Sequence, residues 1–363
     1  MFENFMPIIS GHRGYKGKYP ENTILGFTKC FEAGATNFET DLYLTRDDVV
    51  VVSHDVNTKR TYVKPDGSEA DYNITTSSYE EDLKDLRNKV TGDKLLTFET
   101  VLKFIISNTE NEDRTVMLDI KTYNKPRILK SVFQQILATK NDLNYWLKRL
   151  QFGVWDLDFV KYINQDEYFQ DLHQKYKFEV PVQLIHISGS CERSSEFIYY
   201  NHYLEQVYGK QRHLYKVSGV SLLYLSTWSQ EFLTKFMPLL KANSMCLYTW
   251  TINNTYQYDY FVKVCKSFQV EEYGVLTDDP GRMYEHKMSN VPKETDLLAE
   301  DSTNVKLEFK QKLAGYIFNL FLAFSDMKES DYKSPVDPDH REIKPVNSFF
   351  RNIFMLCQRF GIF

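Results

Sequence analysis

The sequence predicts an α/β protein of the (β/α)8 TIM-barrel class, on the strength of two observations. From about residue 7 to residue 286, short apolar or β-branched runs alternate with segments of helix length, which is typical of parallel strands joined by crossover helices. About eight such units over about 280 residues have the size of one barrel. The 363-residue chain then has room for an appendage after the barrel. A doubly wound open sheet is the main alternative fold.

The first expected helix, Asn22–Ala33, follows the first strand. It places Ile24, Phe27 and Phe31 on one face, and Gly34 is a natural C-cap. Further segments of helix length separate most of the later strands. The eight expected strands are Ile8–Gly11, Phe38–Leu42, Val116–Ile120, Phe152–Trp155, Val182–Ile187, Val217–Leu222, Cys246–Trp250 and Tyr273–Leu276.

Two segments after the second strand carry local signals of their own. Val49–Ser53 follows the charged turn Arg46-Asp47-Asp48, and it is expected to form a hairpin with the second strand, outside the count of eight. Ser78-Tyr79-Glu80-Glu81 has the spacing of a capping box, which predicts the start of a helix.

The chain changes character after Pro292, where a charged and polar stretch begins. We expect a catalytic barrel over residues 1–290 and a C-terminal tail over residues 291–363 with two amphipathic, apolar helices, 313–324 and 346–363. Neither is expected to span a bilayer: the first reaches only about 18 Å, against a hydrocarbon core of about 30 Å. The apolar positions are Leu313, Tyr316, Ile317, Leu320, Phe321 and Phe324 in the first helix, and Val346, Phe349, Phe350, Ile353, Phe354, Cys357 and Phe360 in the second.

The end of the tail also carries a charge pattern. From Lys344 onward the sequence has three basic residues and no Asp or Glu, which suits an anionic lipid surface. We therefore expect the tail to bind a membrane or lipid-droplet surface, with the endoplasmic reticulum and the mitochondrial surface as further candidates. The alternative is that both helices pack back onto the barrel. The N-terminus shows no secretory signal pattern, so an intracellular protein is expected.

Composition excludes several other classes. The chain is 42% hydrophobic and 26% charged, an ordinary globular balance that argues against disorder and against a polytopic membrane protein. The net charge is −5 and there is no long basic run, so no nucleic-acid partner is expected. Five scattered cysteines form no C-x-x-C pair, which disfavours a disulfide framework or a thiolate zinc site.

Polar residues interrupt the apolar runs where strands end, and the carboxyl ends of barrel strands are where catalytic groups lie. Taken singly, each has an ordinary explanation, such as a solvated strand face or a surface ion pair. All of them are nevertheless predicted on the same rim of one barrel, and this convergence favours a functional site. The residues are His12, Arg13, Glu39, Asp41, His54, Asp119, Lys121 and Trp250, with Asp278 and Asp279 in the loop after the eighth strand.

These strings resemble the glycerophosphodiester phosphodiesterases. The resemblance covers most of residues 8–285, including Leu96-Thr97-Phe98-Glu99 before a helix and Trp250-Thr251-Ile252-Asn253 after the seventh strand. The strings that carry it are Gly11-His12-Arg13-Gly14, Pro20-Glu21-Asn22-Thr23, Glu39-Thr40-Asp41 and Val52-Ser53-His54-Asp55.

Within that family, the sequence is most similar to the fungal phosphatidylglycerol phospholipase C branch. An apolar C-terminal tail supports this closer similarity, although most family members have Glu where this chain has Asp119. The strings behind it are Met117-Leu118-Asp119-Ile120-Lys121, Asn141-Asp142-Leu143 before Trp146, and Thr277-Asp278-Asp279-Pro280.

The residue types favour phosphodiester chemistry. Glu39, Asp41 and Asp119 supply hard oxygen ligands, which suit Ca²⁺ or Mg²⁺ better than zinc. Such a cation would offset charge developing on a phosphate oxygen. Arg13 and Lys121 would add positive charge around that phosphate.

The resemblance implies acid and base roles for His12 and His54, and a substrate-binding role for Trp250. We hypothesise that the vicinal hydroxyl of the substrate's glycerol attacks first and gives a cyclic phosphate that water opens. The expected reaction is cleavage of phosphatidylglycerol to diacylglycerol and glycerol phosphate. The alternatives are water-soluble glycerophosphodiesters of the glycerophosphocholine type, a non-catalytic lipid- or phosphate-binding scaffold, and a barrel enzyme of other chemistry.

Overall fold

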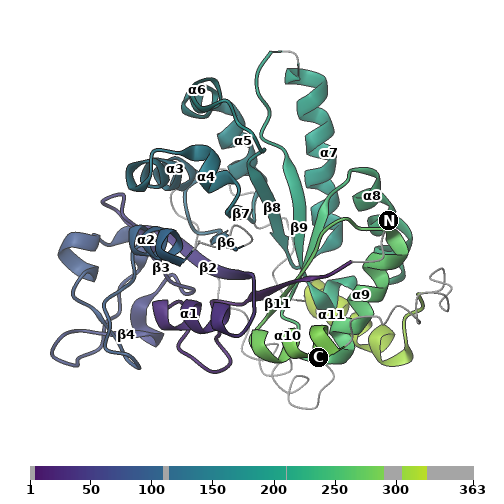
Figure 1. Cartoon of the computed structure of the whole chain (residues 1–363), viewed down its shortest axis with the longest axis horizontal. Coiled ribbons are helices and arrows are strands. Elements are labelled where there is room, and N and C mark those ends of the chain that lie inside the picture. The colour runs from purple at the N-terminus through teal and green to yellow at the C-terminus, as the bar shows by residue number, and fades with distance from the viewer. Residues whose placement is uncertain (1–4, 109–113, 210, 290–304, 325–363) are drawn as a thin grey trace.

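A computed structural model describes residues 5–108, 114–209, 211–289 and 305–324. Within these residues eight parallel strands close into a barrel, which confirms the predicted fold and shows that the open-sheet alternative is wrong (Figure 1). The hydrogen-bonded order is β1-β11-β10-β9-β8-β7-β6-β2, and pairing of β1 with β2 closes the ring. The strands are β1 (Ile8–Gly11), β2 (Asn37–Leu44), β6 (Thr115–Ile120), β7 (Leu150–Val154), β8 (Gln183–Ser188), β9 (Val217–Leu223), β10 (Cys246–Trp250) and β11 (Tyr273–Thr277).

Two of the eight strands have the predicted bounds, and the other six differ by one or two residues at one or both ends. The fourth, β7, begins at Leu150 because its pairing with β6 starts there, opposite Val116. It ends before Trp155, which the sequence analysis placed inside the strand.

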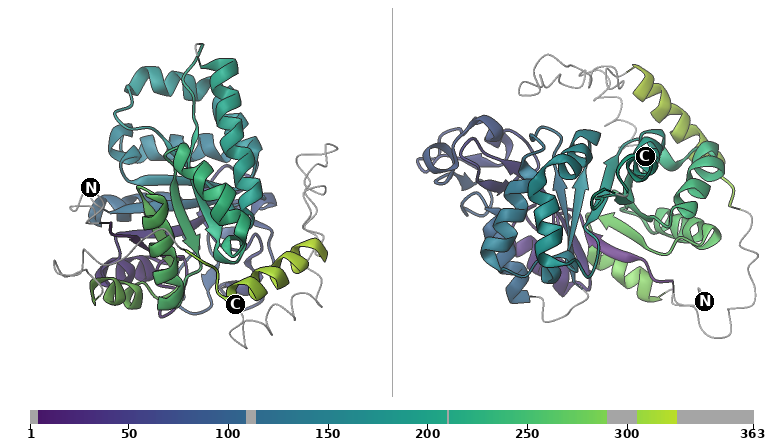
Figure 2. Two further views of the ribbon diagram at one scale, coloured as in Figure 1. Left: turned by 90° about the vertical axis from the view of Figure 1, so that its right-hand side faces the viewer. Right: turned by 90° about the horizontal axis from the view of Figure 1, so that it is seen from above.

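The helices lie around the outside of the barrel (Figures 1 and 2). Shorter helical turns cover Thr58–Arg60, Ile74–Thr76, Tyr79–Leu83, Tyr224–Thr227 and Phe232–Phe236. The helices are α1 (Ile24–Glu32), α2 (Phe98–Asn108), α3 (Ile128–Thr139), α4 (Leu143–Leu147), α5 (Leu157–Gln165), α6 (Glu167–Tyr176), α7 (Cys191–Tyr208), α8 (Met237–Ala242), α9 (Thr255–Phe268), α10 (Pro280–Ser289) and α11 (Phe309–Phe324).

Helix α1 begins two residues later than predicted. Asn22 has a left-handed backbone, with φ of +54°, and cannot belong to the helix. Thr23 is the N-cap, and its Oγ1 accepts a hydrogen bond from the Gly26 amide at 3.0 Å. At the other end Gly34 has a φ of +92°, as expected of a glycine that terminates a helix.

The predicted hairpin is present: β3 (Val50–Val52) runs antiparallel to β2. It leads into an insertion over residues 53–97 that carries the antiparallel pair β4 (Tyr62–Val63) and β5 (Arg87–Asn88) and projects beyond the helices (Figure 1). The insertion shares a small core with β2 and β3, formed by Tyr43, Val51, Tyr62, Ala70, Ile74, Leu83, Leu86 and Leu95.

The capping box at Ser78 is only half formed. The Ser78 hydroxyl accepts from the Glu81 amide at 3.2 Å, as expected. The return bond comes from Asp82, whose carboxylate accepts from the Ser78 amide at 2.8 Å. The Glu81 carboxylate instead forms an ion pair with Arg46, and this pair replaces the expected bond from the Ser78 amide.

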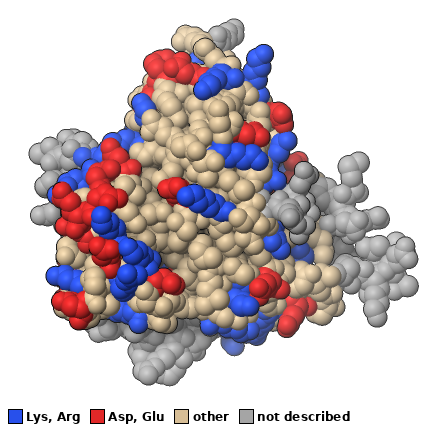
Figure 3. Space-filling view, turned by 60° about the vertical axis from the view of Figure 1, so that its left-hand side comes forward, with Lys and Arg blue, Asp and Glu red and all other residues tan. Residues whose placement is uncertain are grey.

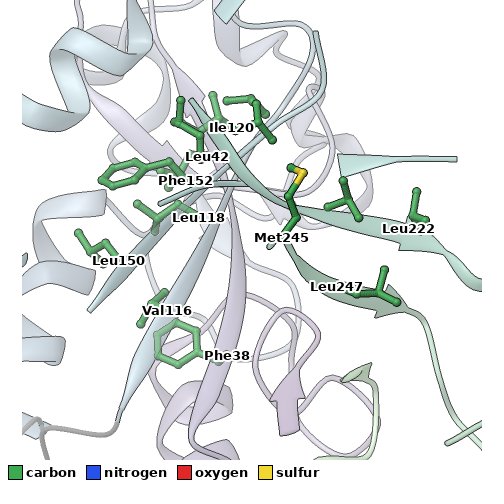
Figure 4. Close-up of a cluster of buried hydrophobic side chains, with 14 of the residues drawn as sticks. Phe38, Leu42, Val116, Leu118, Ile120, Leu150, Phe152, Leu222, Met245 and Leu247 are labelled. Carbon is green, nitrogen blue, oxygen red and sulfur yellow. The ribbon is translucent and has the colours of Figure 1, made fainter. Parts of the chain in front are cut away.

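Side chains alternate across the barrel wall along β2 and β6. Phe38 and Leu42 join Val116, Leu118 and Ile120 in the large apolar cluster between strands and helices (Figure 4). Because successive side chains of a strand point to opposite faces, the residues between them point into the barrel. The interior therefore receives Glu39 and Asp41 from β2, and Met117 and Asp119 from β6.

Helix α11 includes residues 313–324, which were predicted to be helical. Its buried side is formed by Gln311, Ala314 and Phe318. It packs on the turn after β9: a Cβ added at Gly315 would lie 2.3 Å from the Trp228 carbonyl oxygen.

The opposite side of α11 is exposed and apolar. Phe309 is 79% exposed, Leu313 45%, Tyr316 64% and Leu320 39%. The helix therefore packs on the barrel with one face and exposes Leu313, Tyr316 and Leu320 of the predicted apolar stripe on the other. The second predicted tail helix, 346–363, lies outside the described residues. Among those residues, no helix is long and apolar enough to cross a bilayer.

Candidate active site

A pocket of about 530 Å³ lies at the carboxyl ends of the barrel strands. Of the eight residues that were given a catalytic, substrate-binding or metal-binding role, only Asp41 does not line it; this side chain is buried and contacts Lys121. Closure of the barrel thus brings all eight together, while their roles stay predictions. The seven that line the pocket are His12, Arg13, Glu39, His54, Asp119, Lys121 and Trp250.

Three carboxylates form the most acidic part of the site. Glu39, Asp41 and Asp119 are buried, and each places a carboxylate oxygen within 4.8 Å of the other two. Their proximity follows from the sheet, because Asp41 and Asp119 are register partners on β2 and β6 and Glu39 lies two residues earlier on the same face. Burial, together with the charges of Asp41 and Asp119, raises the pKa of Glu39 well above its usual value.

Lys121 neutralises part of this charge. Its Nζ lies 2.6 Å from Asp41 Oδ1 and 2.5 Å from Asp119 Oδ2. Burial alone would lower the pKa of Lys121, but the two aspartates raise it above its usual value. For Asp41 the effects are reversed: burial alone would raise its pKa, but the charge of Lys121 lowers it below its usual value.

The donor set fits a divalent cation. Three closely spaced carboxylates carry more negative charge than the neighbouring Lys121 and Arg13 offset, and all three donors are hard oxygens. These residues could therefore hold the metal, although the donor chemistry does not select one hard cation over another.

Arg13 is held beside the carboxylates by an unusual backbone. Its φ is +53° and that of Gly14 is +82°, so the chain turns sharply after β1. The Arg13 amide donates to Glu39 Oε2 at 2.8 Å. Its guanidinium donates to Glu21 Oε2 at 3.1 Å and lies 3.7 Å from Asp41 Oδ2. These contacts hold the Arg13 guanidinium at the pocket wall.

His12 contacts a carboxylate from the loop that follows the last barrel strand, β11. Its Nδ1 lies 2.7 Å from Asp278 Oδ1. Burial lowers the pKa of His12, and the hydrogen bond to Asp278 only partly opposes this effect. Asp278 is itself held by Asn253, whose side-chain amide donates to Oδ2 at 3.0 Å. With Nδ1 occupied, Nε2 is the ring nitrogen left for a substrate.

His54 has a similar carboxylate partner. Its Nδ1 lies 2.8 Å from Asp55 Oδ1. Burial alone would raise the pKa of Asp55, but the contacts with His54 and Arg60 lower it below its usual range. Each pocket histidine therefore has a carboxylate behind it and its Nε2 available, an arrangement suited to proton transfer on both sides of a reacting group.

Two tryptophans border the acidic cluster. The Trp155 indole donates to Asp119 Oδ1 at 2.7 Å, and its ring meets that of Trp250 edge-on at a centroid distance of 5.9 Å. Sequence analysis did not identify Trp155, Asp55 or Glu21 as site residues, and it placed Asp278 on the rim without giving it a role. In the sequence, only their position could have indicated a role in the site, because each directly follows a strand end or lies in one of the strings that resemble the family.

The pocket has a charged half and an apolar half. The charged groups lie on or after β1, β2, β3, β6 and β11. The apolar half follows β8, β9 and β10 and includes Ile187, Leu223, Tyr224, Leu225 and Trp250. Such a pocket suits a molecule with an anionic group at one end and apolar groups at the other.

A family model described as "Glycerophosphoryl diester phosphodiesterase family" matches residues 12–282. The chain is 50% identical over 56 residues to the uncharacterized protein YqiK of Bacillus subtilis, covering 15% of this chain and 23% of that protein. It is 45% identical over 56 residues to a glycerophosphodiester phosphodiesterase of Bacillus altitudinis, again with 15% and 23% covered. The chain thus aligns with less than a quarter of the length of these curated relatives.

Solved structures share the fold. A glycerophosphodiester phosphodiesterase of Parabacteroides distasonis superposes with a TM-score of 0.53 at 21% identity, covering 79% of this chain and 98% of that one. A phosphodiesterase of Oleispira antarctica, solved in complex with the product sn-glycerol-3-phosphate, gives 0.53 at 17% identity, with 78% and 97% covered. At these identities the similarity supports the barrel.

Proposed function

The chain belongs to the glycerophosphoryl diester phosphodiesterase family, and on this premise we propose that it is a metal-dependent phosphoric diester hydrolase acting on glycerol-phosphate diesters. The observation that carries the proposal is that the three-carboxylate cluster lies at the same pocket that His12 and His54 line. Each part of that arrangement has a task in the cleavage of a phosphodiester.

In this proposal Glu39, Asp41 and Asp119 hold Ca²⁺ or Mg²⁺. When bound, the cation supplies positive charge opposite a non-bridging phosphate oxygen. Arg13 and Lys121 contribute the protein's own positive charge on the same side of the pocket. The indole of Trp155 limits the rotation of Asp119, and Trp250 walls the pocket beside it.

The histidines move the protons. One imidazole removes the proton from the attacking hydroxyl, and the other gives a proton to the departing alkoxide, so that charge does not accumulate on either oxygen. With a vicinal glycerol hydroxyl as nucleophile, the new P–O bond closes a cyclic phosphate while the bond to the leaving group breaks. Water then opens the ring with the two roles exchanged. Asp278 and Asp55 hold the two rings in position.

The preferred substrate in this proposal is phosphatidylglycerol, cleaved to diacylglycerol and glycerol phosphate. The apolar half of the pocket supports it, since Leu223, Tyr224 and Leu225 would face the departing diacylglycerol. The apolar outer face of α11 supports it too, because this helix packs directly against the turn that carries Tyr224 and Leu225. A lipid-cleaving enzyme of the fungal phosphatidylglycerol phospholipase C type has these requirements.

We further propose that the protein works inside the cell on a membrane or lipid-droplet surface, reached through the tail that begins with α11. Of the organelle surfaces, the endoplasmic reticulum and the mitochondrion are equally compatible. A nucleic-acid partner is not part of the proposal: on the face shown in Figure 3, side chains of opposite charge are interspersed and no continuous basic field forms.

The test is a substrate panel. Purified protein is incubated with phosphatidylglycerol, phosphatidylcholine and glycerophosphocholine, with and without chelator, and the products are identified by mass spectrometry. Metal-dependent diacylglycerol release from phosphatidylglycerol supports the full proposal. Turnover of glycerophosphocholine alone would remove the lipid part and leave the diesterase. Absence of turnover with every substrate and every divalent cation would favour a binding scaffold.

A further inference from the structure

We propose that Arg60 is a positioning residue that joins the acid–base residue His54 to the phosphate-binding Arg13 through two intervening carboxylates. This inference rests on the proposed function, because it takes His54 and Arg13 as the groups that act on substrate. Arg60 comes from the insertion and does not line the pocket. Its effect on the reaction would therefore pass entirely through other side chains.

The contacts form a continuous chain of alternating charge. Arg60 Nη2 donates to Glu21 Oε1 at 2.5 Å, and Arg60 Nε donates to Asp55 Oδ2. Each carboxylate uses its other oxygen toward the pocket. Glu21 Oε2 accepts from Arg13 at 3.1 Å, and Asp55 Oδ1 lies 2.8 Å from His54 Nδ1.

The geometry suits arginine. Nε and Nη2 belong to one rigid, planar guanidinium, so the two carboxylates that they bind are held at a fixed separation. Glu21 is only 15% exposed, and burial alone would raise its pKa, but the Arg60 hydrogen bond and the charges of Arg13 and Arg60 lower it. Without Arg60, one oxygen of each carboxylate would lose its partner and both side chains could turn away from the pocket.

The turn that carries Arg60 is itself anchored. The Thr58 hydroxyl donates to the Ala70 carbonyl at 2.8 Å, and the Asn57 side chain accepts from the Lys59 amide at 2.7 Å. Arg60 therefore links the packed insertion to two pocket residues, Arg13 after β1 and His54 after β3. The insertion would in this way control the distance between the Arg13 guanidinium, which binds the phosphate, and the His54 imidazole, which acts as acid or base.

The test compares Arg60→Met with Lys59→Met. Both residues are on the same turn and are about equally exposed, at 51% for Arg60 and 57% for Lys59, but Lys59 pairs with Glu69 and Asp71, outside the chain of contacts. We expect Arg60→Met to lower kcat by about 10-fold or more, since misplacing a reacting group by about 1 Å can cost about 10²-fold. Lys59→Met should keep the wild-type kcat. Guanidinium ion added to Arg60→Ala should restore part of the lost rate.

Arg60→Lys provides a second variant that keeps the charge in case the truncated side chains do not fold. A single ammonium cannot bridge both carboxylates in the same geometry, so its kcat should also fall, by a smaller factor. A double-mutant cycle with Asp55→Asn separates positioning from general stabilisation. Arg60→Met should have a much smaller effect on kcat in the Asp55→Asn background than in the wild type.

The outcomes are distinguishable. Wild-type kcat in both Arg60→Met and Arg60→Lys, or an undiminished Arg60 effect in the Asp55→Asn background, overturns the inference. Retention of full activity by His54→Ala would overturn the proposed function itself. Loss of activity in His54→Ala together with an unaffected Arg60→Met would leave the proposed function standing and remove only the role of Arg60.

Discussion

Asp41 on β2 and Asp119 on β6 are opposite each other in the parallel register, and the Nζ of Lys121 lies within 2.6 Å of a carboxylate oxygen of each. Two buried carboxylates at neighbouring positions would repel each other strongly without such a cation. Glu39 adds a third negative group that Lys121 does not contact. A divalent cation bound by these three oxygens would offset this negative charge.

Removal of any one carboxylate should therefore remove most of the activity. Glu39→Gln and Asp41→Asn keep the side-chain shape, so we expect folded proteins with kcat/KM lower by about 10³-fold, because a bound metal supplies several kcal/mol of transition-state stabilisation. Activity assays with and without chelator, alongside thermal unfolding, check this. Full turnover in excess chelator would show that the metal assignment is wrong.

Asp119→Glu is a matched variant for the same cluster. It preserves the charge and lengthens the arm by one methylene. We expect it to remain active with an altered preference between Ca²⁺ and Mg²⁺, because these ions differ in ligand distance and tolerance of geometry. Titration of activity with each ion measures that preference.

Replacement of either histidine should lower kcat with less effect on KM. General acid–base groups contribute about 10²–10⁴-fold each, which is the expected loss for His12→Ala and His54→Ala. Asp278→Asn should cause a smaller loss, since it leaves the ring of His12 in place but no longer fixes its tautomer. Steady-state kinetics at saturating metal measure these effects.

A substrate analogue separates the enzyme class from the cyclic route. If the vicinal hydroxyl is the nucleophile, a deoxy analogue lacking it should not react, while the parent diester does. Normal turnover of that analogue would exclude the cyclic phosphate and leave direct attack by water.

Stability should fall on mild acidification, partly because of His213. Its ring stacks on that of His173 at a centroid distance of 3.7 Å, and burial, with the neighbouring His173, lowers the pKa of His213 from 6.5 to about 4. The unfolded chain therefore binds a proton below about pH 6.5 that the folded chain binds only near pH 4, so unfolding becomes more favourable as the pH falls through this window. His213→Phe keeps the flat ring and should lose less stability than the wild type between about pH 7 and pH 5, as measured by urea unfolding.

The outer face of α11 should bind lipid without contributing to the fold. Changing Leu313, Tyr316 and Leu320 to Ser should leave the unfolding temperature nearly unchanged, because these side chains are exposed. The same variant should bind less to phosphatidylglycerol-containing vesicles in chelator, where lipid is not consumed. Asn319→Ser, an exposed polar position on the same helix, is the control.

Truncation after Asn304 tests the whole tail. The barrel should remain folded and active on detergent-dispersed substrate, while co-sedimentation with vesicles is lost. The contacts of Ala314 and Phe318 with the barrel predict a modest loss of stability, since a buried Phe contributes about 1.5–3 kcal/mol. A truncated protein that unfolds, or that still sediments with vesicles, would show that the tail serves mainly to cover the barrel.

The amino-acid sequence alone determined the barrel and the rim on which the site lies. On β2 the order Phe38, Glu39, Asp41 and Leu42 already fixes which side chains face the helices and which face the interior, because strand periodicity is a local property. The acidic pair, the histidines and Lys121 could be assigned to one rim for the same reason: every parallel strand ends on the same side of the barrel.

Only the tertiary structure decided which groups support that site. His12 and Asp278 are 266 positions apart and meet only because β11 closes the ring beside β1. Arg60 reaches Glu21 only because the insertion folds back over the first loop. The sequence likewise could not show which face of α11 is buried, since this depends on the turn after β9 against which the helix packs. Local periodicity assigns a face to each residue, but the partner across that face is set by how distant segments close on one another.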